Sequence, residues 1–315
     1  MQTAETIRVE DNSHDVAYQW VKDITGLVSP PDVCIRLLDL VDSPKSTAHE
    51  IGEVISSDPN LSARLLKLVN SSFYNYSGRI ETLSRAIAIV GTRSLYSLVI
   101  SVSAVRAFTK IPAQLINMDS FWRHSLFCGI IARYLAKRCG ILHPERLFVA
   151  GLLHDIGELV LFARAPERSR DLMLAAGGDE NVLAHAERQE FGFSHADLGG
   201  LLATLWQLPE TLVESITYHH TPFDAVCSKQ QAAIVKLADI LADRSELGAL
   251  FESQPRQGAS LEIDNSLWRV TGLCAANFDE SQIIGDAGQQ FIETVGVLFP
   301  DADNSINTDN QEQRF

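Results

Sequence analysis

The sequence has little positive charge and no long apolar run. Its 315 residues contain 26 Lys and Arg against 40 Asp and Glu, which gives a formal net charge of −14. So acidic a chain repels nucleic acid phosphates and anionic membrane surfaces, so we expect neither as a partner. No stretch approaches the ~18 unbroken apolar residues that a membrane-spanning helix needs. The polar, acidic start also lacks the basic-then-apolar pattern of a cleaved export signal.

Cysteines are few and scattered. The chain has five, an odd number, and no CxxC pair. Disulfide-stapled secreted domains use even sets of cysteines, whereas thiols in the cytoplasm stay reduced. We therefore expect no disulfide framework and a cytoplasmic location.

Alternating apolar and polar residues, the pattern of β-strands, are almost absent. Apolar residues recur at steps of three and four, and helix-start signals precede several of these stretches. Thr47 and Glu50 have capping-box spacing, and Asp58-Pro59 places an acidic cap before a first-turn proline. Asp119 is predicted to cap a helix, and a Leu-rich helix is expected from Pro144 through Leu161. The sequence therefore predicts an all-α fold.

The chain divides into five predicted segments. These are an N-terminal tail (1–14), an N-terminal helical lobe (15–115), a core that carries the candidate site (116–250), C-terminal helices packed on this core (251–300) and a disordered acidic tail (301–315). The apolar stripes of the lobe need a surface to cover, and no Gly/Ser linker separates the lobe from the core. We expect lobe and core to form one cooperative unit.

Polar residues that bind metals lie on apolar helix faces. His124 follows Phe121 at helical spacing, His154-Asp155 lies in a predicted apolar helix, and Asp239 shares a face with Val235. A lone histidine on such a face is more often a hydrogen-bonded core residue, and a lone buried aspartate is more often a cap or half of an ion pair. Four such residues together favour a shared metal ion, because unpartnered buried charge is costly. Mixed nitrogen and oxygen ligands suit Fe, Mn, Ni or Zn.

Three further histidines extend this set. His195 follows a predicted helix cap, and His219-His220 end a predicted helix. The paired histidines could instead interact with the dipole and terminal carbonyls of that helix. The remaining four lie in polar or loop contexts and are expected at the surface: His14, His49, His143 and His185.

The order His124, His154-Asp155, Asp239 resembles the H…HD…D signature of the HD superfamily of metal-dependent phosphohydrolases. His195 and His219-His220 match the extra ligands of the two-metal HD-GYP phosphodiesterases. Several runs resemble the HDOD family, the HD-related output domains of bacterial signalling proteins: Pro30–Leu38, Ile55–Ser71, Ala86–Gly91, Glu190–His195, Trp206–Pro209 and His219–Pro222. The resemblance covers roughly residues 22–245. It implies an HD-type helical core with the N-terminal lobe packed on it, and one or two divalent ions held by the seven residues.

The sequence departs from its catalytic relatives at two places. HD-GYP proteins usually carry Lys after His-Asp-Ile-Gly, where this chain has Glu158. Their Gly-Tyr-Pro segment is replaced by Thr221–Ala225. An ionised Glu158 within 4–8 Å of a phosphate would cost roughly 2–4 kcal/mol at an effective dielectric of ~20.

HDOD domains commonly lack some of the metal ligands and are regarded as non-catalytic, whereas this chain keeps the whole set. Two function classes therefore stay open. The favoured one is a signalling output module that binds a signalling protein or a small nucleotide-like ligand. The alternative is a phosphohydrolase acting on a nucleotide or cyclic nucleotide, with Asp155 and a metal-bound water in the catalytic role.

Overall fold

A computed structural model describes residues 3–25, 32–108 apart from 42, 44, 72, 73, 75 and 77, 117–248 apart from 246, and 263–299 apart from 275–277. Side chains are described from residue 13 onward. Every regular element in these ranges is an α-helix, and none is a strand, as the sequence predicts. The helices are α1 (Thr3–Thr25), α2 (Asp32–Val41), α3 (Ala48–Ser56), α4 (Pro59–Val69), α5 (Leu83–Val90), α6 (Thr92–Phe108), α7 (Met118–Arg138), α8 (Glu145–Leu153), α9 (Ile156–Arg164), α10 (Pro166–Ala176), α11 (Glu180–Phe191), α12 (His195–Leu205), α13 (Glu210–Thr217), α14 (Lys229–Asp243), α15 (Asn265–Thr271) and α16 (Glu280–Leu298).

The predicted helix-start residues cap their helices where their side chains can reach free backbone N–H groups. Thr47 and Glu50 form the capping box of α3, and Asp58 caps α4 at the backbone N–H of Leu61. Helix α7 differs from the prediction, because its cap is Asn117, whose side-chain oxygen accepts from two first-turn N–H groups. Asp119 stands inside that first turn, where an acid favours the helix dipole.

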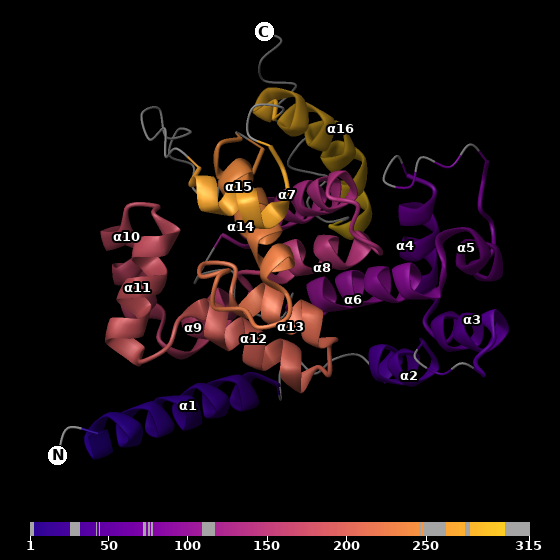
Figure 1. The fold of residues 1–315 in the computed structure, drawn as a ribbon. Helices are drawn as coiled ribbons and strands as arrows, with labels where there is room; N and C mark the ends of the chain where they lie inside the picture. The colour runs from indigo at the N-terminus through magenta and orange to yellow at the C-terminus, as the bar shows by residue number, and fades with distance from the viewer. Residues whose placement is uncertain are drawn as a thin grey trace, which may run out of the picture.

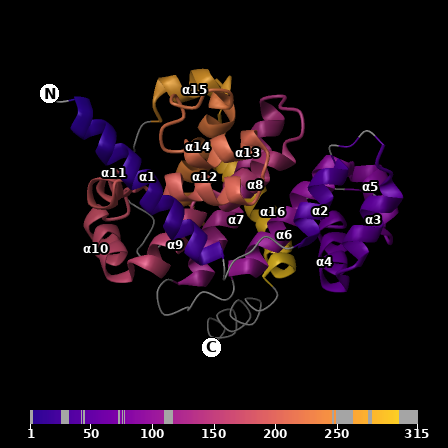
Figure 2. The same cartoon turned by 90° about the horizontal axis from the view of Figure 1, so that it is seen from below.

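Helices α2 to α5 gather on one side of the molecule, and α6 leads from them into the centre (Figures 1 and 2). Helix α6 packs on α2, α4 and α5 of this lobe and on α8 of the core. Helix α16 packs on both α4 and α7, and one cluster of buried apolar residues runs through both parts. The lobe and the core thus share a hydrophobic interior.

Three helices cover the outside of the core in ways that the segment predictions did not anticipate. Helix α1 begins at Thr3, within the predicted tail of 1–14, and packs on α9 and α12 (Figure 1). Helices α10 and α11 pack together as a hairpin beside α9 (Figure 1). The predicted tail of 301–315 lies outside the described residues.

Glycines allow a close approach between two core helices. Helices α7 and α8 cross with Gly129 against Gly151, where an added Cβ on Gly151 would lie 2.8 Å from the Cα of Gly129. Real side chains do not tolerate such a contact. The two glycines let α7 bring His124 close to His154, which follows α8.

No single helix in the described ranges is long and apolar enough to cross a membrane. The pair α5–α6 reaches the required length and composition only when taken together, and it bends by 117°.

Candidate metal centre

The seven candidate ligands come from several helices and from the segments between them, and they meet inside the core. Each is buried, with 0–8% of its surface exposed. His124 projects from α7, Asp239 from α14, and His195 is the first residue of α12. His219 and His220 follow the end of α13.

His154 and Asp155 lie at a break in the predicted helix of 144–161. Helix α8 ends at Leu153 and α9 begins at Ile156, so the expectation of one continuous helix is wrong here. Asp155 occupies the N-cap position of α9, but its side chain makes no capping hydrogen bond. Aspartate normally caps in this position. Here the carboxylate points into the site instead.

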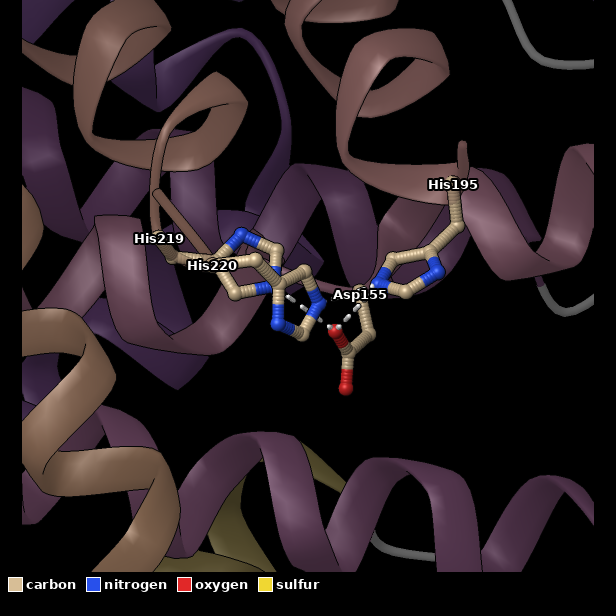
Figure 3. Close-up of side chains that lie close together, drawn as sticks. All are labelled: Asp155, His195, His219 and His220. Atoms are coloured by element: carbon tan, nitrogen blue, oxygen red, sulfur yellow. Dashed lines mark hydrogen bonds and ion pairs between the residues drawn. The ribbon is translucent and has the colours of Figure 1, made fainter. Parts of the chain in front are cut away.

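Asp155 stands between two groups of histidines. One carboxylate oxygen, Oδ2, lies 3.0 Å from Nε2 of His154 and 3.8 Å from Nε2 of His124. The other, Oδ1, lies 3.5 Å from Nε2 of His219 and 3.6 Å from Nε2 of His195 (Figure 3). A carboxylate placed in this way can serve two neighbouring ions at once.

The first ligand set consists of His124, His154 and Asp239. Nε2 of His124 lies 3.2 Å from Oδ1 of Asp239, and Nε2 of His154 lies 3.4 Å from the same oxygen. All three ligand atoms lie within 4.8 Å of one another. Asp155 borders this set through its Oδ2.

The second ligand set consists of Asp155, His195, His219 and His220, again with all ligand atoms within 4.8 Å of one another. Figure 3 shows the three imidazoles arranged around the carboxylate. Nε2 of His195 and Nε2 of His220 are 2.8 Å apart. The structure thus brings together all seven residues predicted from the sequence.

Four histidines of the two sets are held in orientation by a contact on the side of the ring away from the centre. In each of them Nε2 faces the centre, while Nδ1 contacts an acceptor that fixes the ring. Three of these acceptors are backbone carbonyl oxygens. His124 donates to Gly248 (2.7 Å), His154 to Gly151 (2.8 Å) and His219 to Ile216 (2.7 Å).

The fourth acceptor is Glu187, which sequence reasoning missed. Its Oε2 lies 2.7 Å from Nδ1 of His195 and also accepts the backbone N–H of His195 at 2.8 Å. Glu187 is one helical turn after Leu183 on the buried face of α11, and this spacing was the available signal. A carboxylate behind a histidine holds the ring in the orientation of a metal ligand.

The donor set fits a metal ion. Nε2 of His124, His154 and His219, both oxygens of Asp155 and Oδ1 of Asp239 are buried and have no hydrogen-bond partner. Their contacts with one another are ion pairs between histidine and aspartate at 3.0–3.8 Å. Buried polar atoms without partners are rare and costly. A divalent ion between them would satisfy them together, so the buried His and Asp group is suited to a divalent metal.

The pKa values of the site residues also reflect how close the acidic and basic side chains lie to one another. Burial alone would lower the pKa of His124, but Asp239 and Asp243 outweigh it and raise the pKa to about 9. Burial is likewise outweighed at His195, where Glu187 raises the pKa to about 10. The pKa of Asp239 lies well below its usual range, because the charges and contacts of His124 and His154 outweigh burial.

The paired histidines behave differently. Burial lowers the pKa of His219, and burial together with His219 lowers that of His220 well below its usual range. Both imidazoles are therefore neutral near pH 7, which is the form that binds a metal.

Glu158 is buried beside the site, with 3% of its surface exposed. Burial, followed by the charge of Asp155, raises its pKa to about 8. The carboxyl group is therefore largely uncharged at neutral pH in the ion-free centre. The sequence argument, which gave this residue a full negative charge, is wrong for that state.

The nearest cations and the remaining histidines do not belong to either ligand set. Nζ of Lys236 is bonded to the carbonyl oxygen of His220 (2.7 Å) and to Oδ1 of Asn181 (3.1 Å). Arg123 pairs with Asp119 at 3.7 Å. Three of the four histidines expected at the surface are exposed there, His14, His49 and His185, whereas His143 is half-buried and lines a cavity between the lobe and the core. Its left-handed backbone (φ 63°) accompanies that placement.

An all-helical fold with a buried histidine and aspartate cluster in the order H…HD…D defines an HD-type domain. The family model of the HDOD domain matches residues 27–222, so the chain belongs to the HDOD family.

Two solved structures are similar over nearly the whole chain. An HDOD domain protein of unknown function from Geobacter sulfurreducens is 25% identical with a TM-score of 0.69, covering 90% of this chain and 99% of that one. A candidate phosphohydrolase from Shewanella amazonensis SB2B is 27% identical with a TM-score of 0.65, covering 89% and 97%.

A curated relative, an uncharacterized protein of Treponema pallidum (strain Nichols), is 28% identical over 217 residues. These are 68% of this chain, which spans about two fifths (41%) of that relative's length.

Proposed function

We propose that this protein is a bacterial signal-transduction output module that holds a divalent metal in its HD-type centre and acts by binding a ligand or partner, without turnover. Family membership supports the output role. The unpartnered ligand atoms around Asp155 support metal binding. The Asp155 carboxylate belongs to the second ligand set and borders the first, and this placement is the observation that carries the proposal of two ions.

The surroundings of the centre support a binding role over catalysis. All seven ligands are buried, and Glu158 occupies the place of the Lys that HD-GYP enzymes carry. Arg123 and Lys236, the cations nearest in sequence to the candidate ligands, are engaged by other protein groups. A phosphate at the centre would therefore have to rely on the ions for charge compensation.

The partner would be a signalling protein or a small nucleotide-like ligand, in the cytoplasm. All five cysteines are unpaired thiols, which fits a reducing compartment. The acidic net charge of −14 disfavours nucleic acid and anionic membrane as partners.

The second candidate is a metal-dependent phosphohydrolase acting on a nucleotide or cyclic nucleotide. The complete double ligand set favours it, because bound ions supply an activated water for attack at phosphorus. In that case Asp155 would hold both ions in place.

An activity assay separates the two functions. The protein is loaded with Mn²⁺, Fe²⁺ or Ni²⁺ and linear products are followed from cyclic dinucleotides and cyclic mononucleotides, with Asp155→Ala as the control. We expect metal binding without turnover. Turnover by the wild type that disappears in Asp155→Ala would establish the hydrolase instead.

A further inference from the structure

Glu180 is a carboxylate near the centre that belongs to neither ligand set. Glu180 is the first residue of α11, at the turn of the α10–α11 hairpin. One of its oxygens lies within 4.8 Å of ligand atoms of His124 and Asp239, and the residue also groups with His154 and Asp155. The hairpin thus places an acid beside the first ligand set.

Local helix chemistry does not explain this side chain. The N-cap of α11 is Asp179, whose Oδ1 accepts the backbone N–H groups of Asn181 and Val182. Glu180 is therefore free of a capping role. Its Oε2 is completely buried and has no hydrogen-bond partner. A buried carboxylate oxygen without a partner is costly unless a cation completes it.

The start of α11 is fixed to the centre by a second contact. Lys236 on α14 donates to Oδ1 of Asn181 and to the carbonyl oxygen of His220. The residue after Glu180 is therefore linked to the segment that carries the second ligand set. A small cavity lined by Glu158, Leu183 and Glu180 lies beneath the hairpin and borders the same carboxylate.

We propose that Glu180 is a further ligand of the ion held by His124, His154 and Asp239, so that the α10–α11 hairpin closes over this ion. The inference rests on the proposed metal centre. It has a consequence for ligand binding, since an anion that reaches this ion must displace Glu180. The turn of the hairpin carries Gly177 and Gly178 with positive φ (59° and 83°), a backbone form that suits glycine.

The test uses Glu180→Gln in the full chain, with Glu190→Gln as the matched control. Glu190 is on the same helix, is exposed, and pairs with Arg168 at the surface. The metal-free proteins are titrated with Co²⁺, and both the heat and the visible absorption of the bound ion are recorded. We expect Glu180→Gln to weaken one of two binding events about 10–100-fold and to change its absorption, a loss of the size that removing a supporting group at a metal site causes. Glu190→Gln should match the wild type.

Two further measurements, of stability and of phosphate binding, test the role of Glu180 separately from its effect on Co²⁺ affinity. Thermal unfolding of ion-free Glu180→Gln should be no lower than that of the wild type, because the substitution removes an unpartnered buried carboxylate. Inorganic phosphate should bind Co²⁺-loaded Glu180→Gln more tightly than the loaded wild type. Unchanged Co²⁺ affinity, or a loss of ion-free stability with an unchanged metal response, would overturn the role of Glu180 alone. Failure of the wild type to bind Co²⁺ would overturn the metal centre and this inference together.

Discussion

Gly157 is the residue whose substitution tests most sharply how the fold sets the metal centre. It belongs to the His-Asp-Ile-Gly run and lies on α9, where α9 packs against the start of α12. An added Cβ would overlap the carbonyl oxygen of His195 and lie 2.7 Å from the backbone nitrogen of Gly199. Ordinary contacts of this kind begin at 3.4 Å, so α12 would have to move by at least about 0.7 Å.

That displacement is large on the scale of a metal site. Ligand distances are set to within about 0.2 Å, and the backbone that has to move carries the ligand His195. We expect Gly157→Ala to lose the ion of the second ligand set. Forcing a methyl group into a packed contact costs roughly 1–3 kcal/mol of unfolding free energy. The chain should therefore still fold while its metal content falls.

The assay compares Gly157→Ala with Gly285→Ala. Gly285 lies on the exposed side of α16, and an added Cβ there meets no atom within 4 Å. In a helix interior, Ala is more favourable than Gly by about 0.5–1 kcal/mol, so this control should be as stable as the wild type or more so. Metal content is measured by elemental analysis after loading, and stability by thermal unfolding. Gly157→Ala protein with wild-type metal content and affinity would refute the argument that this contact sets the position of His195.

Three further predictions follow from the same geometry. The pKa values of His124 and His195 are raised to about 9 and about 10, so the ion-free protein gains stability from their protons below about pH 6.5 and loses it as the pH rises through those values. Ions compete with the same protons, so the stabilisation given by Mn²⁺ should grow between pH 6.5 and 9; a flat response in unfolding experiments would contradict this. Glu187→Gln should weaken metal binding about 10–100-fold in calorimetric titrations, with the helical circular dichroism retained; undiminished affinity would show that the contact with His195 is dispensable. A fragment of residues 1–115 should show no cooperative unfolding, because α6 packs on α8 of the core and α4 packs on the C-terminal helix α16; a sharp transition would make the lobe an independent domain.

The sequence predicted which residues meet in the centre because the pattern is local. Histidines and aspartates on apolar helix faces can be recognised from spacing alone, as His124 and Asp239 show. The structure adds that Asp155 faces both ligand sets, which spacing does not reveal. Its N-cap position in α9 favours a hydrogen bond to the first turn of that helix. The side chain makes no such bond, because it points to the histidines of the site instead.

The all-helical fold could also be predicted from the sequence, whereas the residues that support the candidate ligands could not. Glu187 and Glu180 sit on α11, a helix that the sequence reading did not predict, and both reach the centre only through the packing of the α10–α11 hairpin. The charge state of Glu158 was misjudged for the same reason. Its burial and its distance from other charges depend on the three-dimensional arrangement of helices distant in sequence.

The most direct test of the metal centre is anomalous diffraction from crystals of metal-loaded protein, collected at the absorption edge of the bound metal. Two peaks are expected about 3.5–4 Å apart, one on each side of Asp155, with Nε2 or carboxylate oxygens of the seven residues about 2.0–2.2 Å from them. One peak at full occupancy would contradict the two-ion arrangement. No peak in protein exposed to Mn²⁺, Fe²⁺, Ni²⁺ and Zn²⁺ in turn would contradict the metal centre itself.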